Sequence, residues 1–121
     1  MSYVDGYIVP VPKANKENYR RMAEAAAAIF TEHGATGLME AWADDVPHGQ
    51  WTDFYRAVQC TDEETVVFSW IIWPDKAARD AGSAAVMADP RMSREAFESQ
   101  FGEVFDGKRM VYGGFMPLVT R

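Results

Sequence analysis

Two runs of the sequence are mostly apolar and have the length of a β-strand: YVDGYIVPVP (3–12) and TVVFSWIIWP (65–74). In residues 3–12 both of the alternating sets of side chains are largely apolar, with Asp5 as the exception on its face. The second run is rich in β-branched and aromatic residues, which are typical of strands. We therefore expect a sheet whose first strand is covered by protein on both faces.

Helical periodicity is clearest over residues 15–34, where Asn15 is the predicted N-cap and Gly34 the residue that ends the helix. Apolar side chains recur there at spacings of three and four, which predicts one apolar stripe opposite a solvated face. Two further helical segments are predicted over residues 75–90 and 93–105. The stripe consists of Tyr19, Met22, Ala23, Ala26, Phe30 and His33.

Three further strands are predicted, over residues 36–46, 51–60 and 110–118. The segment 51–60 is ambiguous, and we interpret it as an extra strand that precedes the run at 65–74. Alternation in 36–46 gives a small apolar set, which we expect to meet the helices, and a mixed set on the other face. The small set is Met39, Ala41 and Ala43, and the mixed set is Leu38, Glu40, Trp42 and Asp44.

A glycine pair, Gly113 and Gly114, lies in the last apolar run, shortly after a pair of basic residues. A phosphate-binding loop needs a strand, then glycines, then the N-terminus of a helix. Here the glycines lie inside the strand, and Pro117 prevents a helix from following. The pair therefore indicates a β-bulge or a close approach of another group to the backbone.

This order of elements is a βαββαβ plan with one extra strand, which predicts an α+β, ferredoxin-like sandwich with an antiparallel sheet. The 121 residues suit a single domain, 1–121. If the helices cover one face of the sheet, residues such as Phe68, Trp70, Ile72 or Tyr7 would be exposed on the other. Two copies that pack sheet to sheet would bury this face, so we expect a homodimer of the dimeric α+β barrel type.

Composition excludes several classes of protein. With 48% hydrophobic residues, disorder is not expected. The segment 40–64 has seven acids and one base, so it accounts for the whole net charge of −6. A phosphate backbone needs a basic surface, so we do not expect nucleic-acid binding. We interpret the acidic segment as solvated loops, with a cation site as the alternative.

The single cysteine, Cys60, cannot form an internal disulfide. One thiol and no recognisable signal peptide predict a cytoplasmic protein. No apolar run approaches the roughly 20 residues that span a bilayer, so no membrane association is expected. Nothing in the sequence near Cys60 would lower the pKa of its thiol, which argues against a nucleophilic role.

Five segments in order resemble the bacterial YbaA-like family of uncharacterised proteins, and the resemblance extends from Tyr3 to about Leu118. That family is similar to the dimeric α+β barrel superfamily, so the resemblance implies the same fold and a dimer. It implies no activity, and the sequence departs from it in a longer spacing before FDGKRM. The segments are YVDGYIVPVPKANKENYR, EAWADDVP, ETVVFSWIIWPDKAARDAG, DPRM and FDGKRMVYGGF.

One constellation could carry chemistry: Asp5, Glu40, Trp42 and Asp44, with Arg109 as a counter-charge. We expect it on the sheet face opposite the helices, around a cavity at the centre of the dimer. Desolvation beside a tryptophan raises the pKa of a carboxyl group, which suits a general base acting on an organic acid or phenol. The alternatives are hydrated or paired side chains at strand ends, or a buried structural salt bridge of Asp5 or Glu40.

The two histidines do not make a metal site, because they lie on unrelated elements and a metal needs three or four ligands. His33 ends the helical stripe, where an imidazole suits the helix dipole. We therefore expect no metal and no cofactor. The catalytic candidates are Asp5, Glu40 and His33, and the candidate ligand pocket comprises Tyr7, Glu40, Trp42, Asp44, Trp70, Arg109 and Tyr112.

Three functional hypotheses follow, and the sequence does not decide whether the protein is an enzyme. The first is a homodimer that binds a small, mainly apolar organic molecule in a pocket between sheet and helices. The second is a cofactor-free monooxygenase or isomerase with a buried carboxylate, which the superfamily resemblance implies only by analogy of fold. The third is a module that binds a basic protein partner through the acidic segment 40–64.

Overall fold

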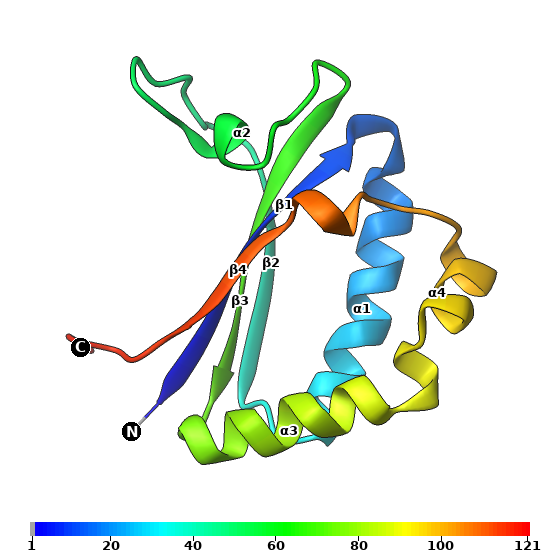
Figure 1. Ribbon diagram of the computed structural model, residues 1–121, viewed down its shortest axis with the longest axis vertical. Helices are drawn as coiled ribbons and strands as arrows, with labels where there is room; N and C mark the ends of the chain where they lie inside the picture. Colours follow the sequence, from blue (N-terminus) through cyan, green and yellow to red (C-terminus); the bar gives the residue numbers. More distant parts are fainter. Residues whose placement is uncertain (1) are drawn as a thin grey trace.

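In a computed structural model, which describes residues 2–121, four strands form one antiparallel sheet in the order β2-β3-β1-β4. Three helices lie on one side of this sheet, and the short α2 lies on the other side near one end (Figure 1). The strands are β1 (Tyr3–Pro12), β2 (Gly37–Trp42), β3 (Glu64–Trp73) and β4 (Val111–Phe115). The helices are α1 (Lys16–Glu32), α2 (Phe54–Ala57), α3 (Lys76–Ala88) and α4 (Arg94–Phe101), with 3₁₀ turns η1 (Lys13–Asn15), η2 (Pro90–Met92) and η3 (Gly107–Arg109).

This architecture confirms the predicted α+β, ferredoxin-like class with an antiparallel sheet, but residues 2–121 form four strands and not the predicted extra one. The strand predicted over 51–60 is wrong, because local hydrogen bonds fold the segment into a compact loop around α2. Asp53 accepts from the backbone N–H of Arg56 at 2.7 Å and from that of Gly49 at 3.1 Å. The Tyr55 hydroxyl donates to the carbonyl of Val46 at 2.8 Å. These bonds outweigh the β-propensity of the aromatic residues.

The ends of the other elements follow local partners. β4 stops at Phe115, which lies opposite Val4. The antiparallel partner strand β1 begins only one residue before Val4, at Tyr3, so little of it is left for β4 to pair with. Gly34 follows α1 with a φ of 109°, which confirms it as the residue that ends the helix. Asn15 precedes α1 as predicted, but its side chain donates to the carbonyl of Val104 at 2.9 Å instead of capping the helix.

The core lies between the sheet and the helices and contains two clusters. Tyr7 packs against both of them. The Val67 cluster consists of Val9, Val11, Tyr19, Ala23, Val67 and Val104. The Trp73 cluster consists of Tyr3, Ala35, Ile71 and Trp73.

The opposite side of the sheet, which we call the open face, is largely apolar, and several of its large side chains are exposed in the single chain. Phe68 is 44% exposed, Met39 48% and Phe115 63%. The strand positions on this side carry one charged side chain among residues 2–121, that of Glu64 at the start of β3, which pairs with Arg109 at 2.6 Å. The positions on this side are Val4, Gly6, Ile8, Pro10, Pro12, Gly37, Met39, Ala41, Glu64, Val66, Phe68, Trp70, Ile72, Val111, Gly113 and Phe115.

The two faces of β2 are the reverse of the prediction. Met39 and Ala41 lie on the open face, whereas Leu38 and Trp42 pack against the two core clusters under the helices. The expectation failed because the bulkier residues of the mixed set fill the core better than the small ones. Glu40, on the same side, accepts a hydrogen bond from Tyr19 of α1.

The glycine pair in β4 marks a close approach, as one of the two predicted alternatives stated. A Cβ atom on Gly114 would lie 2.5 Å from the hydroxyl oxygen of Tyr3 and 2.6 Å from a guanidinium nitrogen of Arg79. A Cβ atom on Gly113 would meet only the ring of Phe115, at 3.6 Å, which is an ordinary contact. The requirement for glycine therefore rests on Gly114.

Candidate functional site

A groove of about 380 Å³ runs between α1 and β2, and we call it the α1–β2 groove. It exists because the face of α1 turned to β2 carries alanines, whose small side chains leave space above the edge strand. Ala23, Ala27, Leu38 and Val67 make its surface largely apolar. The full lining is Lys16, Glu17, Tyr19, Arg20, Ala23, Glu24, Ala27, Leu38, Glu40, Trp42 and Val67.

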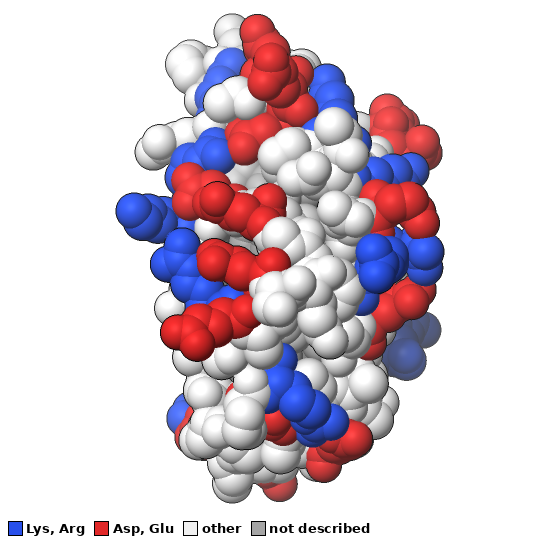
Figure 2. All heavy atoms as spheres, turned by 90° about the vertical axis from the view of Figure 1, so that its right-hand side faces the viewer, with Lys and Arg blue, Asp and Glu red and all other residues white. Residues whose placement is uncertain are grey.

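Exposed charged residues of α1 form one rim of this groove. They alternate in sign along the helix: Lys16, Glu17, Arg20 and Glu24. Figure 2 shows the helical side of the molecule, where acidic and basic side chains are interspersed with uncharged surface. No single sign of charge dominates the approach to the groove.

The polar centre of the groove is a hydrogen bond between a helix and the sheet. The Tyr19 hydroxyl on α1 donates to Oε1 of Glu40 on β2 at 2.7 Å. No salt bridge among residues 2–121 includes Glu40. Burial raises the pKa of its carboxyl group, while hydrogen bonds from Tyr19 and Ser69 act in the opposite direction.

Glu40 also keeps contact with solvent along the groove. The residue as a whole is exposed, yet the surrounding protein atoms displace enough water to raise the pKa of the carboxyl group. Burial and the neighbouring Glu40 also raise the pKa of the Tyr19 hydroxyl, so that residue stays a hydrogen-bond donor at neutral pH. A ligand entering the groove therefore meets a carboxyl oxygen held in place by a fixed donor.

Glu40 belongs to a line of polar side chains that crosses the helix-facing side of the sheet. In register, Glu40 lies opposite Ser69, Ser69 opposite Tyr7, and Tyr7 opposite Tyr112. The rings of Tyr7 and Tyr112 stack with centroids 6.2 Å apart. Burial, with a contribution from Asp5, raises the pKa of Tyr7 to about 12. Tyr7 and Tyr112 lie beyond the α1–β2 groove, and Tyr112 is 70% exposed.

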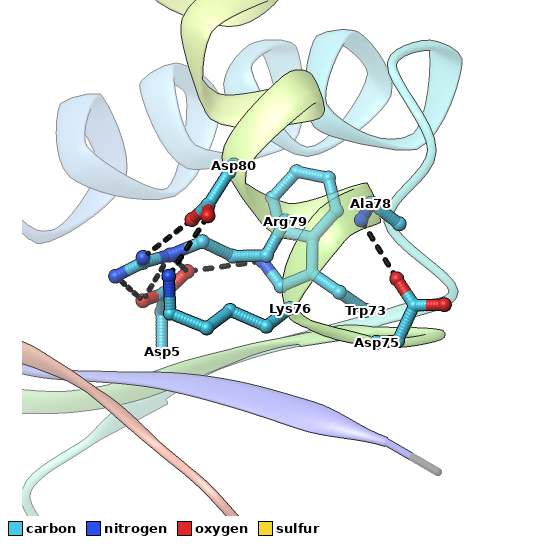
Figure 3. A network of polar contacts seen from close by, with 7 residues as sticks. All are labelled: Asp5, Trp73, Asp75, Lys76, Ala78, Arg79 and Asp80. Atoms are coloured by element: carbon cyan, nitrogen blue, oxygen red, sulfur yellow. Dashed lines mark hydrogen bonds and ion pairs between the residues drawn. The ribbon is translucent and has the colours of Figure 1, made fainter.

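Asp5 forms a buried structural salt bridge, which was one of the alternatives left open by the sequence. It is 5% exposed and forms an ion pair with Arg79 at 2.9 Å (Figure 3). The indole N–H of Trp73 donates to the same carboxylate at 3.0 Å. Arg79 also contacts Asp80 at 3.0 Å. These partners occupy both carboxylate oxygens, so Asp5 is closed to a ligand.

The other candidate pocket residues lie apart from Glu40 and Trp42. Arg109 pairs with Glu64 at 2.6 Å and with Asp106 at 2.9 Å, so it is not the counter-charge of Glu40. Asp44 follows β2 and lines a smaller pocket of about 250 Å³ near α2. Trp70 lies on the open face, where its ring meets that of Phe68.

The histidines have local partners. Nε2 of His33 lies 3.0 Å from Asp89, which joins the end of α1 to the end of α3. His48 stacks on Tyr55 with centroids 4.4 Å apart. Residues 2–121 contain no group of three or more His, Cys, Asp or Glu side chains placed to hold a metal ion. Burial, and then Glu64, raises the pKa of the Cys60 thiol.

The structure thus brings together two of the predicted site residues, Glu40 and Trp42, and adds Tyr19 and Lys16. They lie under α1, so the expectation that they face away from the helices is wrong. The sequence contained one signal for Tyr19: a phenol in an otherwise apolar stripe needs a hydrogen-bond partner. Lys16 gave no signal, because an exposed lysine at the start of a helix is ordinary.

The sequence of residues 2–107 matches the family described as protein of unknown function, DUF1428. The uncharacterized protein YbaA of Escherichia coli K12 is 50% identical over 121 residues, which covers 98% of each chain. The YbaA protein of Shigella flexneri matches equally, with 50% identity over 98% of each chain.

Two solved structures share the fold at low sequence identity. A dimeric ferredoxin-like protein from an uncultured marine organism superposes with a TM-score of 0.63 at 10% identity, over 100% of each chain. A variant of SnoaB, a cofactor-independent oxygenase from Streptomyces nogalater, superposes with a TM-score of 0.57 at 14% identity, over 98% of this chain and 95% of that one. Within residues 2–121, no helix combines the length and apolar character needed to cross a membrane.

Proposed function

Since this chain belongs to the DUF1428 family of proteins of unknown function, we propose a function from its own geometry: the α1–β2 groove binds a small, mainly apolar organic molecule that carries a hydroxyl group. The observation that carries the proposal is the carboxyl group of Glu40. It lies in a largely apolar groove, hydrogen-bonded to Tyr19 at 2.7 Å and without a cation partner among residues 2–121.

Size and chemistry of the groove support this class of ligand. Its volume of about 380 Å³ falls in the range of roughly 300–1,000 Å³ typical of small-molecule sites. Such sites combine an apolar wall with a few fixed polar groups. Here Trp42 offers a flat surface, and the oxygens of Glu40 accept a hydrogen bond. A phenol or other hydroxylated ring satisfies both.

Calorimetry with two ligands tests the proposal: 2-naphthol, which has a hydroxyl donor, and 2-methoxynaphthalene, which lacks it. At neutral pH we expect 2-naphthol to bind roughly tenfold to a hundredfold more tightly, because a hydrogen bond to a charged group contributes about 1.5–3 kcal/mol. Glu40→Leu should remove this preference, and Trp42→Ala should weaken the binding of both ligands. Glu95→Gln, an exposed change on α4, is the matched control.

Two results would contradict the proposal. One is a wild-type protein that binds neither naphthalene. The other is a Glu40→Leu variant that keeps the preference for 2-naphthol. Circular dichroism of each variant separates loss of binding from loss of fold.

A second candidate function is proton transfer, and the raised pKa of Glu40 favours it. A carboxylate in an apolar groove can act as a general base toward an acidic C–H group. NMR exchange of the C1 protons of 2-tetralone in D₂O tests this. Exchange above the buffer rate that is lost in Glu40→Gln supports an enzyme. Exchange at the buffer rate leaves only the binding function.

We also propose that two copies associate through the open face. An antiparallel sheet with a solvated face carries polar side chains there, whereas the strand positions of the open face are almost all apolar, and the charged one among residues 2–121, Glu64 at one end, is already paired with Arg109. Beyond β4, which is an edge strand of the sheet, the chain carries the further exposed apolar residues Met116, Leu118 and Val119. The dimeric ferredoxin-like neighbour covers the whole chain and supports a partner of this kind.

Native mass spectrometry of the untagged protein tests this association. We expect a dimer for the wild type and a monomer for Phe68→Glu, which places a charge in the centre of the open face. Ala28→Glu adds the same charge on the exposed side of α1 and should leave the dimer intact. A monomeric wild type would overturn the association, while the groove belongs to one chain and is tested separately.

A further inference from the structure

The charges on the rim of the α1–β2 groove are paired with one exception. Arg20 donates to Glu17 at 2.7 Å and also forms an ion pair with Glu24. This leaves Lys16, which has no ion pair among residues 2–121 although it lines the same groove.

Lys16 is held above the aromatic wall of the groove. Its Nζ lies 5.4 Å from the centroid of the Trp42 ring, which is a cation–π distance. Lys16 is also the first residue of α1, where the positive end of the helix dipole adds to its charge. An ammonium group at this position is therefore available to an anion that reaches the mouth of the groove.

The groove thus has two poles. Glu40 is an acceptor, held by Tyr19, and Lys16 is a donor with a positive charge. The ring of Trp42 lines the same groove, and Lys16 lies over that ring. A molecule complementary to both poles carries a hydroxyl group at one end, an aromatic ring in the middle and an anionic group at the other end.

We propose that the α1–β2 groove selects aromatic hydroxy acids, with the hydroxyl on Glu40 and the carboxylate on Lys16. This inference rests on the proposed binding function and specifies its ligand class. Lys16 is the residue that determines specificity, because the other rim cation is already neutralised by two glutamates. A cationic ligand would be repelled by the positive charge of Lys16 at the mouth of the groove.

Calorimetry at pH 7 with 6-hydroxy-2-naphthoate, 2-naphthol and 2-naphthylmethylamine tests the proposal. We expect the hydroxy acid to bind roughly twofold to fivefold more tightly than 2-naphthol, and this advantage to shrink with added salt. Lys16→Met should abolish the advantage and leave 2-naphthol unchanged, whereas Lys16→Arg should keep it. Lys108→Met removes another exposed lysine, outside the groove, and should change nothing.

The outcomes separate this inference from the function on which it rests. Equal affinities of the hydroxy acid and 2-naphthol would overturn the selectivity for acids but keep the binding function. Persistence of the advantage in Lys16→Met, or tighter binding of the amine than of the acid, would have the same effect. Failure of all three compounds to bind the wild type would overturn both proposals.

Discussion

At the scale of single residues, Asp5 shows how a carboxylate can be buried between the sheet and the helices. It is 5% exposed, and Arg79 supplies its counter-charge. Arg79→Met would leave a buried carboxylate with only the Trp73 N–H, so we expect a loss of about 2–3 kcal/mol in the free energy of unfolding, after allowing for the partial exposure of Arg79. Urea denaturation measures this loss.

Lys76→Met is the control for that measurement. It removes an exposed ion pair with Asp80 next to the same network and should leave the urea midpoint nearly unchanged. Equal midpoints for the wild type and Arg79→Met would show that the buried pair contributes nothing to stability.

Glu64 makes a pH-dependent contribution to stability. The hydrogen bonds from Arg109 hold its pKa at about 2, against an ordinary value of 4.5. The unfolded chain therefore takes up this proton first, and the stabilisation is present above about pH 4.5 and lost as the pH falls toward 2. We expect the Tm of Glu64→Gln to lie below that of the wild type at pH 7 and to approach it near pH 2. A constant difference between the two across this range would contradict the assignment.

At the scale of elements, the last strand depends on one glycine. A Cβ atom at position 114 would lie 2.5 Å from the Tyr3 hydroxyl and 2.6 Å from Arg79, which Asp5 holds in place. We expect Gly114→Ala to lower the free energy of unfolding by about 1–3 kcal/mol through overpacking. Gly113→Ala, whose Cβ would meet only Phe115 at 3.6 Å, should cost less. Comparable losses in the two variants would refute the role of close approach.

Elements with a long periodic pattern could be predicted from the sequence. The strand at 3–12, the run at 65–74 and the helix at 15–34 all formed close to their expected ends. The segment 51–60 could not be predicted, because its fold depends on backbone groups that bond to the Asp53 carboxylate. These bonds leave no periodic pattern.

The candidate site was predicted in part. Alternation placed Glu40 and Trp42 on one face, and the structure brings them into one groove. Alternation alone could not say which face meets the helices, since that depends on Tyr19, a residue 21 positions away. Asp5, Arg109 and Glu40 lie on three different elements, and only tertiary pairing shows that the first two are neutralised.

At the scale of the whole molecule, the open face links stability to protein concentration. Phe68, Met39 and Phe115 are 44%, 48% and 63% exposed in one chain, so association through this face would remove apolar surface from water only in the folded state. A partner that binds only the folded chain raises the Tm by mass action.

We therefore expect the Tm of the wild type to rise with protein concentration over the micromolar range, as measured by differential scanning calorimetry. In Phe68→Glu the Tm should be independent of concentration, because association through the open face would bury the new charge without a partner and is therefore prevented. Ala28→Glu carries the same charge on the helical side and should keep the concentration dependence of the wild type. If all three proteins give a constant Tm, the open face is stable in water without a second copy, and self-association does not explain its apolar surface.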